Sequence, residues 1–275
     1  MKKIAIQGDS GSFHHVAATT WYDTTIEIVP CQSFKSTFQV LQDGTADAAV
    51  VAIENSLHGS INEVYDLLLA YKYPIVGEVI ERIHQCLIGF PNTAIANIDA
   101  VYSHPVALSQ CSEYLDTVLS GAKRYEYYDT AASVEFIKKH GQPNHAAIAS
   151  NLAAKLHGMN VLQQDVQNAD TNFTRFLIID QETPTDATNK ASLVVETSHT
   201  PGSLHDVLGI FKRHNVNITK LQSRPSKRSV WNYMFYIDIE SDKNTTMKLV
   251  TLLTNAKCSV TLLGTYRSSI KPVDV

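Results

Sequence analysis

Short apolar runs alternate with amphipathic segments from Met1 to about Gln181. Continuous runs such as Ala48 to Ile53 are typical of strands buried in a parallel sheet, whereas the intervening segments carry apolar residues at helical spacing. The pattern predicts strands at 2–8, 25–29, 48–53, 98–102, 125–128, 146–149 and 172–180, with one or two more within 73–90. It predicts helices at 13–21, 34–42, 63–71, 106–118, 131–139 and 152–157. This alternation indicates an open, mostly parallel α/β sheet with helices on both faces.

The order of elements changes after a polar, proline-containing segment at 182–190. We interpret this segment as a linker between a domain at 1–181 and a second domain at 191–275. Beyond it the pattern predicts strands at 191–196, 218–221, 231–239 and 259–266, and helices at 204–214 and 247–255. The resulting order, βαββαβ, is that of a ferredoxin-like sandwich. A sandwich of this size leaves one sheet face or edge exposed, and it often completes its burial by pairing with a copy of itself.

Composition narrows the class of protein. The 275 residues are 44% hydrophobic and 18% charged, the balance of a globular protein with a sizeable core. The net charge of −4 argues against a nucleic-acid partner, and the basic pair Lys227-Arg228 is too short to bind a phosphate backbone. The first apolar run is too short for a signal peptide, and no run approaches the ~18 apolar residues of a membrane helix. Four widely spaced cysteines without a CxxC pair indicate neither a zinc site nor a disulfide framework, so we expect a cytoplasmic protein.

Four predicted loops follow a strand and precede a helix, at 8–12, 54–60, 103–105 and 129–130. In open α/β sheets, ligands bind at this edge. Each helix start offers unpaired backbone N–H groups, so several starts together make a site for a small carboxylate without much lysine. The alternative for each loop is a simple helix cap, which fits Asp129-Thr130 best. Glu54-Asn55-Ser56 is harder to explain in this way, because a cap needs only one of its three hydrogen-bonding side chains.

The strand predicted at 172–180 begins with Thr174-Arg175, a hydroxyl and a guanidinium that are also compatible with an ordinary strand end. Other chemistries find little support. GxGxxG and P-loop patterns are absent, and adjacent Ser103-His104 without a GxSxG elbow does not favour a nucleophilic serine. The histidines have no metal-ligand spacing, and we expect His14-His15 at the surface or at the helix start, so no metal site is predicted.

Taken together, these stretches resemble the prephenate dehydratase family. Residues 8–18 resemble the family's GPxGTFSHxAA, residues 53–60 match IENSxxGS, and residues 103–111 resemble SHPQALxQC. The positions that depart from these motifs are Asp9, Ser12, His14 and Val106, and the stretches 129–131 and 172–176 complete the set. The resemblance implies a catalytic domain of two α/β lobes with a cleft, like a periplasmic binding protein. It also implies a cofactor-free lyase of phenylalanine biosynthesis that converts prephenate to phenylpyruvate, water and CO2.

By resemblance, the catalytic residues are Thr174, Glu54, Asn55, Ser103 and Gln110, and the substrate-binding residues are Ser12, Ser56, Thr130 and Arg175. The Thr174 hydroxyl would donate a hydrogen bond, or relay a proton, to the hydroxyl that leaves as water, because threonine is too weak an acid to ionise near neutral pH. Neutral amides and hydroxyls suit the substrate carboxylates, since excess positive charge would hold back the departing one. In a regular strand Arg175 points away from Thr174, so a structural ion pair is its alternative role. Glu54 either holds neighbouring groups in place or helps to protonate.

Residues 191–275 resemble an ACT domain of the phenylalanine-sensing type, with 201–205 and 222–225 standing for the GALV and ESRP motifs. The resemblance implies inhibition by phenylalanine at an interface between two chains, through Gly202, Ser203, Leu204, His205, Asn217, Gln222, Ser223, Arg224 and Pro225. Ser203, His205 and Gln222 depart from the family residues. A homodimer or homotetramer through this domain is implied. No chorismate mutase segment precedes Met1, so we expect a monofunctional chain.

Two alternatives stay open. Arogenate carries an amino group where prephenate carries a keto group, and nothing in the sequence separates the two substrates. The chain is also compatible with an amino-acid-sensing binding protein whose α/β half no longer turns over. The intact Glu54-Asn55-Ser56 and Thr174-Arg175 argue against that second alternative.

Overall fold

The computed structural model describes residues 1–23, 25–140, 142–182, 187–226 and 233–269. Its Cα positions group into two compact units. The first contains Met1–Ile61 and Ile80–Phe176, and the second contains Asn62–Val79 and the described residues from Leu177 onward. Strands β5 (Ile75–Arg82) and β11 (Phe173–Asp180) therefore belong partly to each unit.

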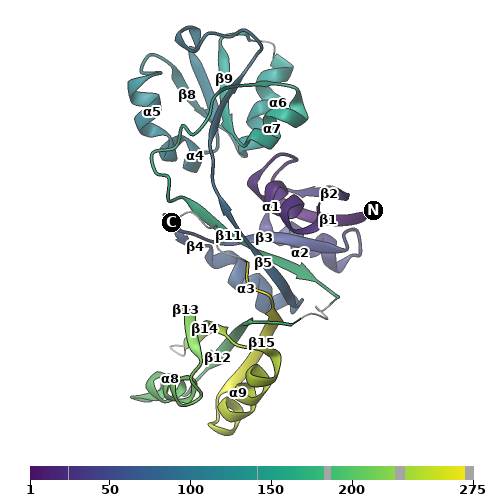
Figure 1. The fold of residues 1–275 in the computed structure, drawn as a ribbon, viewed down its shortest axis with the longest axis vertical. Helices are drawn as coiled ribbons and strands as arrows, with labels where there is room; N and C mark the ends of the chain where they lie inside the picture. Colours follow the sequence, from purple (N-terminus) through teal and green to yellow (C-terminus); the bar gives the residue numbers. More distant parts are fainter. Residues whose placement is uncertain (24, 141, 183–186, 227–232, 270–275) are drawn as a thin grey trace. The chain divides into compact units, whose positions relative to one another are not determined.

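A six-stranded sheet forms around the amino terminus, in the order β2-β1-β3-β11-β5 with β4 paired to β3. Its remaining strands are β1 (Lys2–Gln7), β2 (Ile26–Cys31), β3 (Ala48–Asn55) and β4 (Gly59–Ser60). β1 is parallel to both β2 and β3. Helices α1 (Phe13–Tyr22) and α2 (Phe34–Gln42) pack on these strands, as the purple ribbon of Figure 1 shows. A capping box begins α2, in which Ser33 Oγ accepts from the Ser36 N–H and Ser36 Oγ accepts from the Ser33 N–H.

A second sheet in the first unit has the order β10-β6-β9-β7-β8. Its strands are β6 (Cys86–Gly89), β7 (Ala100–Ser103), β8 (Lys123–Glu126), β9 (His145–Ala149) and β10 (Asn160–Gln163). The helical segments between them are η1 (Ile95–Asn97), α4 (Pro105–Gln110), α5 (Ser112–Thr117), α6 (Thr130–His140) and α7 (Asn151–His157). β7 is parallel to β8 and β9, whereas β6 is antiparallel to β9 and β10. The chain enters this sheet after β5 and leaves it before β11, so the first unit contains two α/β lobes.

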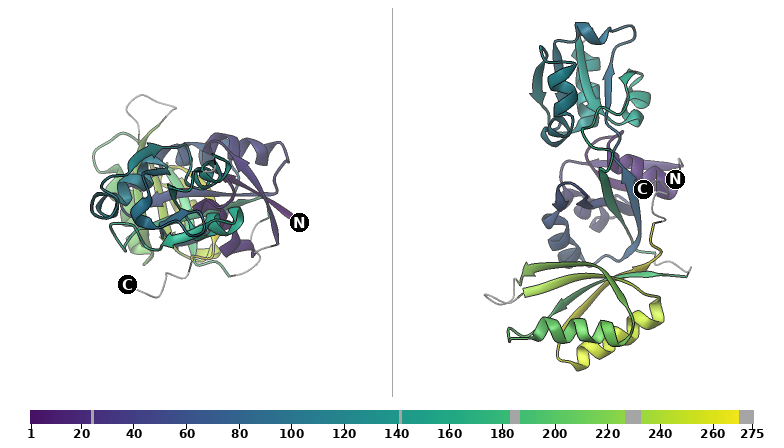
Figure 2. Two further views of the ribbon diagram at one scale, coloured as in Figure 1. Left: turned by 90° about the horizontal axis from the view of Figure 1, so that it is seen from above. Right: turned by 60° about the vertical axis from the view of Figure 1, so that its left-hand side comes forward.

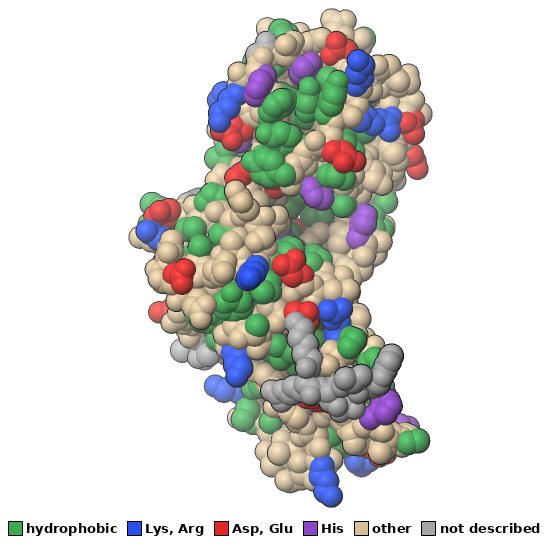
Figure 3. Space-filling view, turned by 180° about the vertical axis from the view of Figure 1, so that it is seen from behind, with side chains coloured by type: hydrophobic (Ala, Val, Ile, Leu, Met, Phe, Trp, Pro, Cys, Tyr) green, Lys and Arg blue, Asp and Glu red, His purple; other side chains and the backbone are tan. Residues whose placement is uncertain are grey.

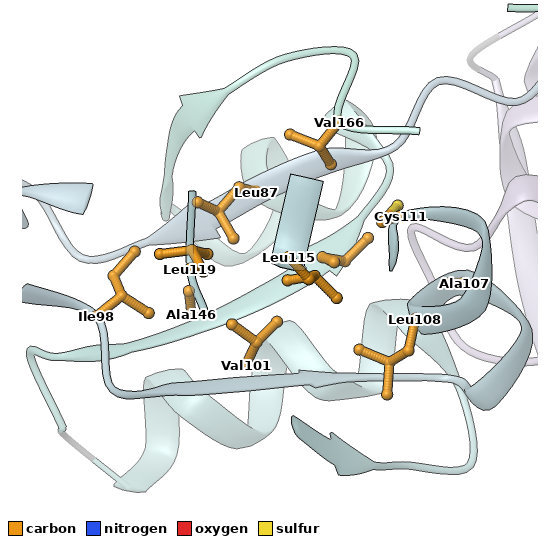
Figure 4. Packing of buried hydrophobic residues seen from close by; sticks show 11 residues of the cluster. Leu87, Ile98, Val101, Ala107, Leu108, Cys111, Leu115, Leu119, Ala146 and Val166 are labelled. Atoms are coloured by element: carbon orange, nitrogen blue, oxygen red, sulfur yellow. The ribbon is translucent and has the colours of Figure 1, made fainter. Parts of the chain in front are cut away.

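The core of the second lobe is made by apolar side chains that converge from both strands and helices (Figure 4). Leu87 of β6, Val101 of β7 and Leu115 of α5 are each fully buried there. Burial of one such leucine stabilises a fold by roughly 1.5–3 kcal/mol relative to exposure. This core fixes α4 and α5 against the sheet, and with them the end of α4 that carries Gln110.

The second unit contains a four-stranded antiparallel sheet in the order β13-β14-β12-β15. Its elements are β12 (Lys190–Glu196), α8 (Ser203–Arg213), β13 (Asn217–Pro225), β14 (Tyr233–Glu240), α9 (Lys243–Asn255) and β15 (Ser259–Tyr266). Both helices lie on one face of this sheet (Figure 2). They bury alternate strand residues, among them Leu193, Val195 and Ile237. The order βαββαβ confirms the predicted ferredoxin-like sandwich.

Within the same unit, helix α3 (Asn62–Tyr71) and β5 contact residues of the opposite sheet face. The buried Tyr236 hydroxyl donates to the Tyr65 carbonyl at 2.9 Å, and Arg224 Nη2 lies 3.3 Å from Asp66 Oδ2. In addition, the buried Glu78 carboxylate accepts two bonds from Lys190 Nζ, at 2.8 and 2.9 Å. The segment at 62–79 is thus joined to this sheet by hydrogen bonds and ion pairs.

The predicted fold class is confirmed, but several boundaries are wrong. The single helix predicted at 106–118 is broken at Cys111 into α4 and α5. Asn168 fills the break, because its Oδ1 accepts from the Glu113 N–H at 3.0 Å and its Nδ2 donates to Ser112 Oγ at 2.9 Å. The strand predicted at 125–128 lies at Lys123–Glu126 instead, where its residues pair with β7 in parallel register. Strands β4 and β10 were not predicted, since each is short and gains its partners from distant segments.

Other predicted elements agree more closely with the structure. α2 and β15 have the predicted bounds, whereas β13 is longer than the predicted 218–221. Positions 231 and 232 of a predicted strand, and 183–186 of the predicted linker, lie outside the described residues. Among the described residues, no helix is long and apolar enough to cross a membrane. Acidic and basic side chains are interspersed on the face drawn in Figure 3.

Candidate active site

Asn55, the last residue of β3, is the centre of a hydrogen-bond network with the start of β11. Its Nδ2 lies 2.7 Å from Asn172 Oδ1, 2.9 Å from Thr174 Oγ1 and 3.2 Å from the Phe173 carbonyl. Its Oδ1 accepts from the backbone N–H groups of Leu57 and His58, both at 3.0 Å. The oxygen therefore shapes the loop after β3, while the nitrogen points toward acceptors on Asn172 and on the start of β11.

The Thr174 hydroxyl is consequently set up as a donor. Thr174 is 8% exposed, and its Oγ1 accepts from Asn55. Among the described residues, this hydroxyl donates no hydrogen bond in return. Because the accepted bond uses a lone pair, the hydroxyl hydrogen is left for a molecule bound beside it.

Ser56 joins the same loop to the segment that leads into β11, and its hydroxyl is used in doing so. Its Oγ donates to the Thr171 carbonyl at 2.7 Å and accepts from the Phe173 N–H at 2.9 Å. The Ser56 N–H also donates to the Phe173 carbonyl at 2.8 Å. Ser56 therefore holds Thr174 in place through the backbone.

Glu54 and Arg175 form an ion pair beside this network. Arg175 Nη1 lies 4.0 Å from Glu54 Oε2, and the two side chains are 12% and 36% exposed. The pair places a carboxylate next to the guanidinium, which reduces the positive charge that a bound anion would meet. Arg175 thus has the structural partner that its alternative role requires.

The second lobe contributes Gln110 and Ser103, with different outcomes. Gln110 Nε2 lies 3.4 Å from His58 Nδ1, so this amide reaches the loop that Asn55 shapes. Ser103 is fully buried, and its Oγ donates to the Ile148 carbonyl at 2.6 Å. Its hydroxyl therefore ties β7 to β9 and is already engaged.

The loop after β1 contacts the start of α6. Gly8 has a φ of +93°, and a Cβ there would lie 2.5 Å from Asp129 Oδ2 and 3.5 Å from Ser12 Cβ. Asp129 caps α6 by accepting from the Ala131 and Ala132 N–H groups at 2.8 and 3.0 Å, and its burial raises its pKa. Thr130 is the first residue of α6. Ser12 is 3% exposed, and its Oγ has no partner among the described residues, which marks it as a group available to a ligand.

Two further contacts join the lobes near this loop. The Tyr128 hydroxyl donates to Asp9 Oδ2 at 2.9 Å, and Ser150 Oγ donates to the Gly11 carbonyl at 2.5 Å. Although the Tyr128 side chain is mostly exposed, desolvation of its hydroxyl and the neighbouring Asp9 carboxylate raise its pKa, so the hydroxyl stays protonated. The loops at 8–12 and 54–60 therefore each have partners on the second lobe.

His14 lies at the start of α1, one of the two predicted positions, but its side chain is buried in the core and not at the surface. Its Nε2 accepts from the Ala52 N–H at 3.1 Å, and its ring packs edge-on against Phe176 at 5.0 Å. Burial lowers the pKa of His14 from 6.5 to about 3, so it is a neutral packing residue. Among the described residues there is no cluster of His, Cys, Asp and Glu that could hold a metal ion.

Among the described residues, two of those predicted to bind an effector line different cavities, Ser203 one and Asn217 another. Ser203 lines a cavity of about 310 Å³ with Thr197 to Pro201, Tyr233 and Phe235. Asn217 donates to Glu240 Oε2 at 2.8 Å, and Gln222 donates to the Ser223 carbonyl at 3.2 Å. The remaining members are the exposed Gly202, with a φ of +86°, the partly buried Leu204, the exposed His205 and Pro225, and Arg224, which contacts Asp66.

Three residues near the site were given no role from the sequence. Asn172 is 1% exposed and holds the Asn55 amide, and His58 lies between Asn55 and Gln110. Gln85 is 2% exposed and donates to Gln110 Oε1 at 3.4 Å. Asn172 belongs to the stretch 172–176 that carries part of the family resemblance. His58 falls on an open position of IENSxxGS, and Gln85 lies in no motif that could have indicated a role.

Fold and site together define a two-lobed α/β protein with amide and hydroxyl groups gathered at strand ends, followed by a ferredoxin-like domain. The family model for prephenate dehydratase matches residues 4–184, and the model for the ACT domain matches residues 191–246. The chain therefore belongs to the prephenate dehydratase family and carries an ACT domain.

Curated relatives support this assignment. The bifunctional chorismate mutase/prephenate dehydratase of Escherichia coli K12 is 34% identical over 283 residues, which cover 99% of this chain and 72% of that protein. Arogenate dehydratase 2 of Petunia hybrida is 36% identical over 256 residues, covering 87% of this chain and 64% of that protein. The bifunctional chorismate mutase/prephenate dehydratase of Aquifex aeolicus is 33% identical over 243 residues, which cover 88% of this chain and 66% of that protein. The chain thus spans about two thirds of the length of several relatives that it matches.

Two solved structures are similar over nearly the whole chain. One, described as GqqA, a novel type of quorum-quenching acylase, is 29% identical with a TM-score of 0.88, covering 98% of both chains. The other is a prephenate dehydratase from Arthrobacter aurescens in complex with L-Phe. It is 25% identical with a TM-score of 0.85, covering 96% of this chain and 89% of that one.

Proposed function

We propose that this chain converts prephenate to phenylpyruvate, water and CO2, as a step in phenylalanine biosynthesis. The observation that carries the proposal is the Thr174 hydroxyl, which accepts from Asn55 and has its hydrogen left to donate. Loss of water and CO2 from prephenate creates an aromatic ring, so the product itself provides the driving force. The protein has to hold the dianion and stabilise the departing hydroxyl, which needs no cofactor.

Four of the predicted residues have a role in the reaction that we propose. Thr174 donates to the hydroxyl that leaves, and one such donor typically contributes about 3 kcal/mol, or 100-fold or more in rate. Gln110 offers an amide to a substrate carboxylate, and Ser12 offers a buried hydroxyl. Asn55 acts through Thr174, since its amide nitrogen already has three acceptors, one on Asn172 and two on β11.

Charge balance supports decarboxylation at this site. A carboxylate leaves as neutral CO2, so a strong positive field would stabilise the reactant more than the transition state. The Arg175 guanidinium is compensated by Glu54, and the other candidate donors are uncharged. We propose that Arg175 attracts the dianion while Glu54 limits the strength of that attraction.

The decisive experiment is incubation of the protein with prephenate, with phenylpyruvate followed by its absorbance. We expect turnover by the wild type, a loss of 100-fold or more in kcat for Thr174→Val, and partial recovery for Thr174→Ser, which restores a hydroxyl. Thr171→Val is the matched control, because Thr171 is exposed and contributes its backbone carbonyl to Ser56. Full activity of Thr174→Val would exclude this role for the hydroxyl.

A second substrate, arogenate, is supported by the 36% identity to a petunia arogenate dehydratase. Both substrates carry the ring hydroxyl on which Thr174 is proposed to act and a side-chain carboxylate that Gln110 is proposed to hold. The ratio of kcat/KM for prephenate and arogenate decides between them, and we expect prephenate to be preferred. The opposite ratio would reassign the chain as an arogenate dehydratase.

Acyl hydrolysis is the second candidate function, because the match to the structure described as an acylase covers 98% of this chain and 98% of that one. A serine acylase needs a hydroxyl that a base can deprotonate. The hydroxyls of Ser103 and Ser56 donate to the carbonyls of Ile148 and Thr171, which disfavours both as nucleophiles. Release of an acyl chain from an acyl-amide substrate, lost in Ser12→Ala, would support this candidate instead.

We further propose that phenylalanine inhibits the reaction by binding to the ACT domain at an interface between two chains. The cavity beside Ser203 provides an apolar wall from Phe235 and Tyr233 together with hydroxyls from Thr197 and Thr200. The predicted effector residues of β13, which are Asn217 and Gln222 to Pro225, are not among the described residues that line this cavity, so we propose that a partner's β13 completes the site. Binding should raise thermal stability, lower the rate and depend on a homodimer or homotetramer in light scattering.

The proposed location is the cytoplasm, where cysteines stay reduced. All four cysteines are free thiols, and Cys31, Cys86 and Cys111 are buried. Cell fractionation with an antibody against the chain tests this location.

A further inference from the structure

His58 lies at a contact between the two lobes, although the family motif leaves its position open. Its side chain is exposed at the tip of the loop after β3. Its Nδ1 is 3.2 Å from Asn55 Oδ1 and 3.4 Å from Gln110 Nε2. One imidazole nitrogen therefore touches both the residue that holds Thr174 and the proposed carboxylate ligand of the second lobe.

The orientation of the Gln110 amide is set by Gln85. Gln85 Nε2 donates to Gln110 Oε1 at 3.4 Å, so Gln110 turns its NH2 group toward His58. Gln85 is itself fixed, because its N–H donates to Gln167 Oε1 at 2.9 Å and its carbonyl accepts from the Val166 N–H at 3.0 Å. His58 Nδ1 thus faces a donor from Gln110.

On its other side, the same nitrogen faces an acceptor. The Asn55 amide nitrogen is engaged by Asn172 and Thr174, so Asn55 cannot turn its NH2 group toward the ring and presents Oδ1 to it instead. A bare Nδ1 accepts from Gln110 and opposes the Asn55 oxygen, whereas a protonated Nδ1 donates to Asn55 and opposes the Gln110 amide. Neither tautomer satisfies both neighbours.

We propose that His58 is a positioning residue that exchanges these two partners when a substrate carboxylate binds. Without ligand, Nδ1 is bare and accepts from Gln110, while Asn55 Oδ1 keeps its two backbone donors. A carboxylate draws the Gln110 NH2 to itself, and the imidazole proton then moves from Nε2 to Nδ1 by exchange with water. The new Nδ1–H donates to Asn55 Oδ1, so carboxylate capture on one lobe steadies Asn55 and, through it, Thr174 on the other.

This proposal rests on the proposed prephenate dehydratase function, but one of its tests does not need turnover. With ¹⁵N-labelled histidine, the ring nitrogens of His58 give distinct NMR shifts for the bare and protonated forms, and His58→Asn assigns the signals. We expect Nδ1 to change from bare to protonated when phenylpyruvate, which retains a carboxylate, is added at saturation. An unchanged tautomer at saturation would overturn the exchange, whether or not the protein turns over prephenate.

The kinetic test compares His58→Leu with His58→Asn. Leucine removes both hydrogen-bond roles, and we expect kcat to fall about tenfold and KM for prephenate to rise. Asparagine presents a rotatable amide near the Nδ1 position, so it should stay within about threefold of the wild type. His140→Leu is the matched control, because His140 is also exposed and bonds the Phe136 carbonyl on α6. Equal kinetics of His58→Leu and the control would overturn the proposal.

A double-mutant cycle separates this role from a general effect on the fold. If His58 acts on kcat through Thr174, His58→Leu will not lower kcat further in the Thr174→Val background, although its effect on KM will persist through Gln110. Additive losses in kcat would overturn the link to Thr174. Absence of turnover by the wild type would instead reject the proposed function, and the NMR result would then decide on His58 alone.

Discussion

Asn55→Asp tests the hydrogen-bond direction on which the proposed chemistry depends, with almost no change of shape. Aspartate keeps the oxygen that accepts from the Leu57 and His58 N–H groups. It replaces the amide nitrogen by a second oxygen that faces Asn172, Phe173 and Thr174. The donor of the network therefore becomes an acceptor.

The expected loss follows from the Thr174 hydroxyl. A carboxylate 2.9 Å from Oγ1 takes the hydroxyl hydrogen for itself, because hydrogen bonds to a charged group are the stronger ones. The departing hydroxyl of the substrate then loses its donor, and kcat should fall about 100-fold or more, equivalent to about 3 kcal/mol. The fold should suffer less. Asn172 Nδ2 has no partner among the described residues and can turn toward the new carboxylate, leaving the Phe173 carbonyl opposed at a cost of about 1–3 kcal/mol.

Phenylpyruvate formation from saturating prephenate gives kcat, and thermal denaturation gives stability. Asn151→Asp is the matched control, since Asn151 is an exposed residue at the start of α7 and the charge change is the same. Combination with Thr174→Val should add little to the loss in kcat, because both variants remove one donor. If Asn55→Asp stays folded and retains more than a tenth of the wild-type kcat, the assignment of Thr174 as the donor is wrong.

Three further predictions concern stability and regulation. His14 has a pKa of about 3 in the folded chain and 6.5 when unfolded. Its contribution to the free energy of unfolding is therefore complete above pH 6.5. This stability is lost as the pH falls toward 3, at up to ~1.4 kcal/mol per pH unit. Urea melts of His14→Gln should show a shallower loss between pH 6 and 4, and an unchanged slope would contradict this. Gly264→Ala places a Cβ 2.1 Å from the Ile75 carbonyl oxygen and should cost more than about 3 kcal/mol in thermal unfolding, so a stable variant would show that β5 can move away. Tyr236→Phe removes the donor to the Tyr65 carbonyl on α3, the helix that follows the Asn55 loop in the chain. It should weaken inhibition by phenylalanine without changing the phenylalanine Kd from calorimetry; inhibition equal to the wild type would exclude this contact as a route of regulation.

Local signals explain why much of the fold could be predicted. Ser33 and Ser36 form a capping box from neighbouring residues, and α2 begins where the sequence predicts. β3 is apolar from Ala48 to Ile53, and the sheet buries it. The break at Cys111 could not be predicted in this way, because Asn168, which fills it, lies more than fifty residues away.

The site residues likewise divide into those that local motifs indicate and those that depend on distant partners. The sequence brought Thr174 and Asn55 to attention through motifs that each occupy a few consecutive residues. It ranked Ser103 beside them and gave no role to His58 or Gln85, because a motif does not show which hydrogen-bond partners a side chain will meet. The helix start was one of the two positions predicted for His14, but its burial was not predicted for the same reason, since its acceptor role toward the Ala52 N–H arises from packing between α1 and β3.

By itself, the sequence determined most of the order of elements, the ferredoxin-like end of the chain and the family. Those properties depend on apolar periodicity and on short motifs, which are local. Tertiary structure alone decided which polar groups are left for a ligand. Ser103 and Thr174 are both buried hydroxyls, but one donates to the Ile148 carbonyl and the other accepts from Asn55, 119 residues away in the chain. A hydroxyl can donate to a ligand only when its protein partner donates to the hydroxyl oxygen and the hydroxyl hydrogen stays unused. The tertiary structure decides which partner lies beside it.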